Sequence, residues 1–226
     1  MNKNGDNILV IAAHPDDETI GCAGTIRKHI TRGDAVYAIS FTDGVSSRHN
    51  THTSNEEIED RRNAARESAS KLGFTWIAQE EFPDNKLDII PLLELAKVIE
   101  QAKLKVKPSI IYTHSSADLN IDHRRVHEAT LIAFRPQPSD VWKEIRAYEI
   151  PSSSEWGVKP FSPNLYINIT DFISLKKTAL ACYTSEMPPP PHPRSIDAIE
   201  TLCKLRGAQS GFKYAEAFEI IRSRCS

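Results

Sequence analysis

The sequence of 226 residues lacks several features that would indicate a class of protein at once. Its four cysteines, at positions 22, 182, 203 and 225, form no C-x-x-C pair, so neither a zinc knuckle nor a redox pair is indicated. A chain of this length buries a core without disulfides, and we therefore expect free thiols in a cytoplasmic protein. Positive charge is not in surplus, because 28 lysines and arginines face 30 aspartates and glutamates. Nucleic acid is therefore not an expected partner.

Long hydrophobic runs and internal repeats are missing as well. The apolar stretch at residues 8–13 is too short for a signal sequence or a membrane span, so neither is expected. No G-x-G-x-x-G follows this stretch, since Gly21 and Gly24 lie inside the helix expected there. Length and an ordinary hydrophobic content of 40% predict a single domain over residues 1–226. Its partner is expected to be a small molecule.

Strand-like and helix-like segments alternate along the chain. Residues 8–13 are a continuous apolar run typical of a strand buried on both faces, residues 19–31 have helical spacing, and residues 35–42 form a second strand. Further strands are expected at 74–78, 109–113, 145–150 and 165–169, and further helices at 55–72, 91–104, 122–134, 171–183 and 196–205. This order predicts an α/β fold with a doubly wound, mostly parallel sheet, whose ligand binds beyond the carboxyl ends of the strands.

The most informative segment, His14-Pro15-Asp16-Asp17-Glu18, lies where the first expected strand ends. An imidazole and a carboxylate within four residues suit a divalent ion such as Zn²⁺, and His14 and Asp17 can converge on one ion. Because Pro15 turns the chain between them, Asp16 would lie beside the metal without binding it and could accept a proton from metal-bound water. Helix capping by the two aspartates is the simpler alternative, which the clustering of five such residues disfavours.

A second cluster, residues 118–127, follows the fourth expected strand. His123 and His127 are spaced i, i+4, as in a two-histidine zinc pair, but Arg124 stands where an H-E-x-x-H peptidase needs glutamate. The better construction combines His123 with the two ligands of the first cluster and leaves an open position for water and substrate. Asp122 or a backbone carbonyl is then available to orient an imidazole. His127 is expected to be a surface or capping histidine.

These segments resemble the zinc-dependent N-acetylglucosaminyl deacetylases (PIG-L/LmbE-like). The likeness rests on residues 14–18, 41–44, 118–124, 192–195 and 214–218. It implies a Rossmann-like three-layer α/β/α fold with one Zn²⁺, and hydrolysis of an N-acetyl group from an amino sugar or sugar conjugate. Position by position, His14, Asp17 and His123 correspond to the metal ligands and Asp16 to the general base. Fe²⁺ or Co²⁺ would suit the same ligands.

The resemblance also implies catalytic roles for two further residues. Many family members carry a histidine where this chain has Asn120, and an amide can donate a neutral hydrogen bond to an oxyanion but cannot release a proton. Protonation of the leaving amine then falls to Asp16 or to His192. Candidate substrate-binding residues are Asp43, Arg61, Arg62 and Asp84. The alternatives are that Asp43 positions its loop, that the two arginines belong to a solvated helix face, and that Asp84 only forms a turn.

Several expectations remain open at this stage. Arg48, His49 and His52 lie in a long polar loop that could cover the cleft, and the resemblance makes a homo-oligomer plausible. One alternative function is the same metal chemistry on a non-sugar acyl amide or ester. Another is a sugar- or nucleotide-binding module with a degenerate metal site, which the intact His14, Asp16, Asp17 and His123 disfavour.

Overall fold

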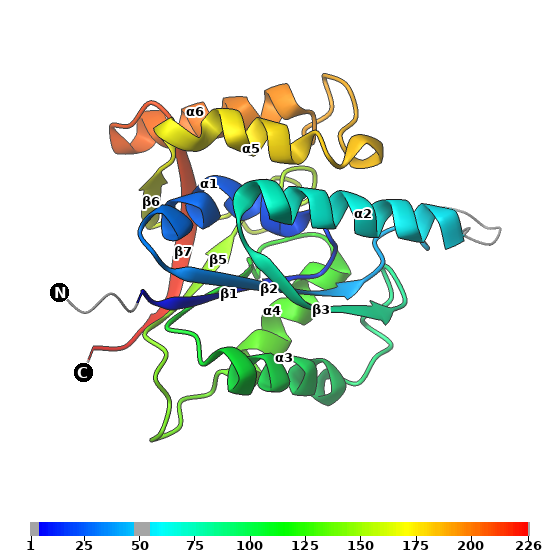
Figure 1. Ribbon diagram of the computed structural model, residues 1–226, viewed down its shortest axis with the longest axis vertical. Coiled ribbons are helices and arrows are strands. Elements are labelled where there is room, and N and C mark those ends of the chain that lie inside the picture. The colour runs from blue at the N-terminus through cyan, green and yellow to red at the C-terminus, as the bar shows by residue number, and fades with distance from the viewer. Residues whose placement is uncertain (1–4, 48–54, 226) are drawn as a thin grey trace.

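The computed structural model describes residues 5–47 and 55–225, and its strands and helices alternate as predicted (Figure 1). The strands are β1 (Asn7–Ala12), β2 (Ala35–Thr42), β3 (Thr75–Phe82), β4 (Ile110–His114), β5 (Glu144–Tyr148), β6 (Leu165–Asn168) and β7 (Ala215–Ser223). The helices are α1 (Asp17–Thr31), α2 (Asn55–Leu72), α3 (Leu92–Val106), α4 (Ile121–Ala133), α5 (Ile173–Leu180) and α6 (Ile196–Ser210). Two short 3₁₀ turns, η1 (Thr170–Phe172) and η2 (Thr184–Glu186), flank α5. The expected helix at 171–183 is therefore shorter, and the expected strands omitted β7.

The seven strands form one sheet in the order β3-β2-β1-β4-β5-β7-β6. Strands β3, β2, β1, β4 and β5 are parallel, while β7 runs antiparallel to both β5 and β6. The predicted mostly parallel sheet is confirmed. The strand order reverses between β1 and β4, and in open α/β sheets the crevice beyond the carboxyl ends of such a pair is the usual ligand site.

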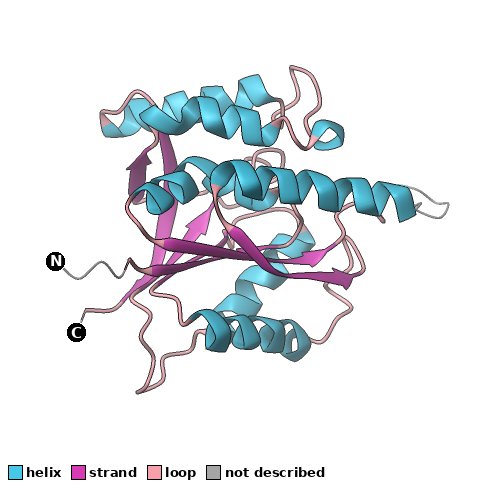
Figure 2. Cartoon of the chain, viewed as in Figure 1, coloured by secondary structure: helices cyan, strands magenta, loops and turns pink. Residues whose placement is uncertain are grey.

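Helices cover both faces of the sheet, which confirms the predicted three-layer arrangement (Figure 2). Helices α1, α2, α5 and α6 contribute to the apolar core on one face, and α3 and α4 pack on the other. Successive side chains of β1 point to opposite cores, with Ile8 and Val10 on the first face and Leu9 and Ile11 on the second. This double burial explains why the first strand is apolar at every position. Among the described residues, no helix combines the length and apolar composition needed to cross a bilayer.

Candidate metal and catalytic site

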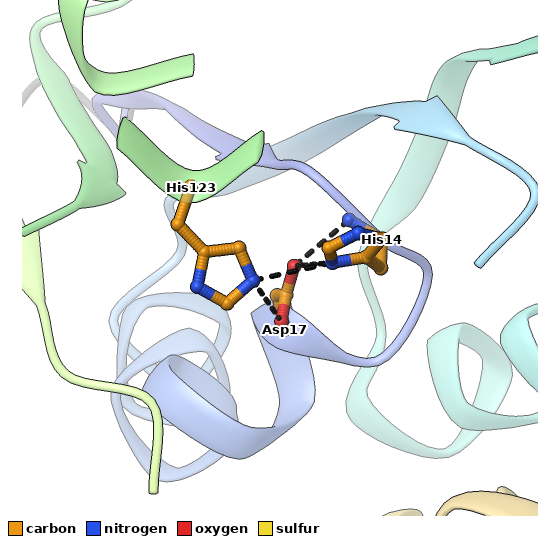
Figure 3. Close-up of side chains that lie close together, drawn as sticks. All are labelled: His14, Asp17 and His123. Atoms are coloured by element: carbon orange, nitrogen blue, oxygen red, sulfur yellow. Dashed lines mark hydrogen bonds and ion pairs between the residues drawn. The ribbon is translucent and has the colours of Figure 1, made fainter. Parts of the chain in front are cut away.

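The three predicted metal ligands face one another at the carboxyl ends of β1 and β4 (Figure 3). His14 Nδ1 lies 3.2 Å from both Asp17 Oδ2 and His123 Nε2, and His123 Nε2 lies 3.5 Å from Asp17 Oδ1. Four donors placed tetrahedrally around zinc, with bonds of about 2.0–2.1 Å, are about 3.3 Å apart. Two imidazole nitrogens and one carboxylate at this spacing therefore fit Zn²⁺ both in donor type and in size.

Local hydrogen bonds place these side chains. His14 lies in the turn between β1 and α1, where its backbone N–H donates to Asp17 Oδ2 at 2.8 Å. His123 lies in the first turn of α4, which begins after Asn120. Asn120 Oδ1 caps this helix by accepting from the backbone N–H groups of Asp122 and His123. Asn120 is therefore the residue that fixes where the helix carrying His123 begins.

Carboxylates contact the other nitrogen of each imidazole. His14 Nε2 lies 3.1 Å from Asp84 Oδ1 and 3.3 Å from Asp122 Oδ2, and His123 Nδ1 lies 2.9 Å from Asp118 Oδ2. All three carboxylates are buried. Such partners fix the ring orientation and tautomer of a metal-binding histidine and raise its basicity. Asp122 thus lies where the sequence predicted an orienting group, whereas Asp118 and its contact with His123 were not predicted.

The site concentrates negative charge around the imidazoles. Burial alone lowers the pKa of His14, but Asp17, Asp122 and Asp84 outweigh it and hold that pKa well above its ordinary value. Burial likewise opposes ionisation of Asp17, yet His123, His114 and His14 keep its pKa well below the usual range. The same carboxylates that hold a proton on His14 would stabilise a divalent cation in its place.

His114 is a buried histidine beneath the cluster that sequence reasoning did not select. Burial, together with the neighbouring His123, lowers its pKa to about 4, so the ring is neutral at ordinary pH. Its Nε2 accepts the backbone N–H of Ala13 at 2.9 Å, and its ring stacks on that of His123 with centroids 4.0 Å apart. These contacts indicate that His114 supports the end of β1 and the His123 ring.

Asp16 is buried between two arginines. Its Oδ2 accepts from Arg61 at 3.0 Å and also from Arg194, while Oδ1 has no hydrogen-bond partner among the described residues. Arg61 also lies 2.7 Å from Glu186, so its charge is balanced by two carboxylates. Arg194 was missed, although the sequence analysis had singled out residues 192–195. It is 178 positions from Asp16, and no spacing rule connects residues so far apart.

A pocket of about 280 Å³ opens over this cluster. Six predicted residues line it, namely His14, Asp16, Arg61, Asp84, Asn120 and His123. The other residues that line it are Gly44, Ser47, Asn85, Ile150, Ser152, Ser153, Glu186 and Arg194. Asn120 Nδ2 donates to Asn85 Oδ1 at 3.0 Å at this surface. The lining is predominantly polar, which suits a hydroxyl-rich ligand.

Four predicted site residues do not line the pocket. The first, Asp17, contacts His14 and His123, which do line it. Asp43 Oδ1 accepts from the backbone of Val45 and Ser46 and shapes its own loop. Arg62 pairs with Glu81 at the surface. His192 Nδ1 accepts the backbone N–H of Arg194 at 3.1 Å.

Two further expectations concern histidines and the polar loop. His127 is buried, with Nδ1 2.8 Å from the carbonyl oxygen of His114, so the expectation of a surface or capping histidine was wrong. One turn beyond His123 on the helix, it faces the sheet. Arg48, His49 and His52 lie outside the described residues.

Glu18 is a buried acid behind the site. Its Oε1 accepts from the hydroxyl groups of Tyr183 at 2.8 Å and Thr19 at 2.6 Å. Burial, only partly offset by these hydrogen bonds, raises the pKa of Glu18 to about 7.

Comparison with known proteins agrees with this geometry. Residues 9–134, more than half of the chain, match the family described as PIG-L, GlcNAc-PI de-N-acetylase. The chain is 28% identical to the uncharacterized deacetylase YaiS of Escherichia coli, over 79% of this chain and 90% of that protein. It is 27% identical to the diacetylchitobiose deacetylase of Thermococcus kodakarensis, over 95% of this chain and 82% of that protein.

One solved structure is similar to this chain in both fold and sequence. The N,N′-diacetylchitobiose deacetylase from Pyrococcus horikoshii superposes with a TM-score of 0.76 at 25% identity, covering 97% of this chain and 85% of that one. The predicted family and the predicted enzyme class, a hydrolase of amide bonds in N-acetyl sugars, are confirmed at the level of the family. The chain belongs to the PIG-L family of de-N-acetylases.

Proposed function

We propose that the protein is a zinc-dependent hydrolase that removes the N-acetyl group from a GlcNAc-type amino sugar or sugar conjugate. The observation that carries this proposal is the spacing of 3.2–3.5 Å among the donor atoms of His14, Asp17 and His123, beneath a pocket that also presents Asp16. The relatives named as deacetylases of diacetylchitobiose support the substrate class.

In this proposal His14, Asp17 and His123 hold the metal. When bound, Zn²⁺ supplies a Lewis acid that polarises the acetyl carbonyl and acidifies a water molecule. Asp84 and Asp122 keep Nδ1 of His14 directed at the metal position, and Asp118 does the same for Nε2 of His123.

Asp16 is the proposed general base. Its Oδ2 is held by Arg61 and Arg194, which fixes the side chain and leaves Oδ1 without a partner among the described residues. Oδ1 accepts the proton of the attacking water and then delivers it to the leaving amine. One carboxylate performs both transfers because Asn120, in place of a histidine, has no acidic proton to give.

Asn120 and His192 have supporting roles in this proposal. Because Asn120 Oδ1 caps α4, its Nδ2–H is the group available to donate to the developing oxyanion. His192 acts through Arg194, whose backbone N–H it accepts. Arg61 and Asp84, together with Ser47 and Asn85, are the proposed contacts for sugar hydroxyls.

The experiment is acetate release from N-acetylglucosamine and N,N′-diacetylchitobiose by zinc-loaded protein. Asp16→Asn should retain zinc and lose on the order of 100-fold or more in turnover, because it removes the base without touching a ligand. Turnover by Asp16→Asn at the wild-type rate would refute the assigned base. Zinc-loaded protein that releases acetate from neither sugar would favour a different acyl substrate.

A further inference from the structure

We propose that a groove beside the active-site pocket binds an uncharged, apolar substituent on C1 of the sugar. The preferred substrate would then be an apolar glycoside of N-acetylglucosamine, in preference to the free sugar or a conjugate with an acidic substituent. This inference rests on the proposed deacetylase function and specifies its substrate class.

The groove has a volume of about 510 Å³, larger than the polar pocket. It lies between the chain that connects β5 to β6 and the helix α6. Its apolar side chains are Pro151, Val158, Phe161, Pro193, Leu202 and Leu205. The pocket of about 280 Å³ is of a size for a single sugar ring, so a long substituent on that ring must extend beyond it.

Two chain segments form a common rim between the groove and the pocket. Pro151 and Ser154 line the groove, whereas Ile150, Ser152 and Ser153 line the pocket. Just before α6, Pro193 lines the groove and the next residue, Arg194, lines the pocket. A substituent that leaves the pocket across either segment therefore enters the groove.

Two of the apolar side chains that line the groove are strongly exposed. Val158 is fully exposed and Leu205 is 52% exposed. A concave surface that gathers such side chains beside a polar pocket is typical of a binding site for an apolar group. Burial of these side chains against an alkyl or aryl substituent would remove apolar surface of both partners from water.

The charged side chains around the groove already have hydrogen-bond partners. Arg206 donates to both carboxylate oxygens of Glu149, at 2.7 and 2.6 Å, and Glu155 accepts the backbone N–H of Ser152 at 2.7 Å. On the pocket side, Asp16 engages both Arg61 and Arg194. Among the described lining residues, no arginine is left unpaired to bind a phosphate or carboxylate, so an uncharged occupant is favoured.

The test is acetate release from methyl, butyl and hexyl glycosides of N-acetylglucosamine. Each fully buried methylene favours binding about fourfold, and in an open groove we expect kcat/KM to rise at least about tenfold from methyl to hexyl. Val158→Glu and Leu205→Glu should abolish this rise, whereas kcat/KM for the methyl glycoside should stay at the wild-type value. The matched control, Leu104→Glu on α3, alters another exposed leucine away from the site and should preserve the rise.

Further measurements distinguish the C1 substituent from other possible occupants of the groove. A kcat/KM that is flat across the glycosides but rises with longer N-acyl chains would overturn the assignment to C1. Dissociation of a wild-type oligomer by Leu205→Glu, seen by sedimentation, would show that a second copy of the chain occupies the groove. Calorimetry with hexyl and methyl glucoside, which have no acetyl group, tests the groove independently of catalysis. Tighter binding of hexyl glucoside would support the groove even if no acetate were released, and equal binding would overturn it.

Discussion

Replacement of Asp122 by asparagine should weaken zinc binding without removing a ligand. Asp122 is fully buried. Its Oδ2 accepts the backbone N–H of Asn85 at 2.8 Å and lies 3.3 Å from His14 Nε2. Its Oδ1 accepts the backbone N–H of Leu87 at 2.9 Å. An amide has only one acceptor oxygen, so its NH₂ group must face one of these N–H groups. The buried donor left without an acceptor costs about 1–3 kcal/mol of stability. Asp84 remains 3.1 Å from His14 Nε2, but loss of the second carboxylate behind this imidazole should still weaken zinc binding, by about 10-fold.

The assay is a zinc titration in competition with a chromophoric chelator, paired with urea unfolding of the metal-free protein. Asp34→Asn is the matched control. Asp34 likewise accepts a backbone N–H, from Asp6 at 2.9 Å, and contacts an imidazole, His29 Nδ1 at 2.7 Å, but it precedes β2 at the opposite end of the sheet. Both variants should lose stability, and only Asp122→Asn should lose zinc affinity. Wild-type zinc affinity in a destabilised Asp122→Asn would refute the orienting role.

Two further predictions concern buried charge. In the folded protein Glu18 keeps its proton up to about pH 7, whereas in the unfolded chain it loses the proton at its lower, ordinary pKa. The stability of the fold should therefore fall as pH rises between these two pKa values. In urea unfolding of the metal-free proteins, the free energy of unfolding of Glu18→Gln should rise relative to wild type by up to about 3 kcal/mol between pH 4 and pH 8. A constant difference between the two proteins over this pH range would contradict the prediction. Lys176→Met removes the ammonium that lies 2.6 Å from the buried carboxylate of Glu216 and leaves that charge with only backbone N–H partners, those of Gly24 and Thr25, among the described residues. It should therefore cost about 3–5 kcal/mol of stability. Lys177→Met, which removes a more exposed ion pair, should cost less than about 1 kcal/mol of stability. Equal stability losses in the two variants would contradict the larger contribution assigned to the buried pair.

The candidate metal cluster could be predicted from short motifs at the ends of two strands. His14 and Asp17 lie within four residues at the end of an evident buried strand, and the rule for parallel sheets brings the end of β4 beside them. His123 then follows at the start of the next helix. These inferences required only strand order and the chemistry of the side chains.

Helix periodicity could have separated Arg61 from Arg62. The buried face of α2 includes Ala65, Ala69 and Leu72, and Arg61 continues that face one turn earlier. Arg62 lies outside this face and pairs with Glu81. The burial of Arg61 is therefore a feature that helical periodicity predicts, although the two arginines were expected to act alike.

Arg194 had no such signal. It reaches Asp16 from the segment before α6, and this contact depends on how the antiparallel end of the sheet and its covering helices pack. The strand β7, which sets that end of the sheet, was itself not predicted. Tertiary packing of distant segments is the part of the site that pattern reasoning leaves undetermined.

The zinc content of His123→Ala tests the central claim most directly, with His127→Ala as its control. Both histidines are buried on α4 one turn apart, but only His123 faces His14 and Asp17, while His127 bonds the carbonyl of His114. After equilibration with zinc and gel filtration, we predict about one zinc per chain for wild type and His127→Ala, and roughly a tenth of that or less for His123→Ala. A full equivalent of zinc in folded His123→Ala would contradict the assigned site.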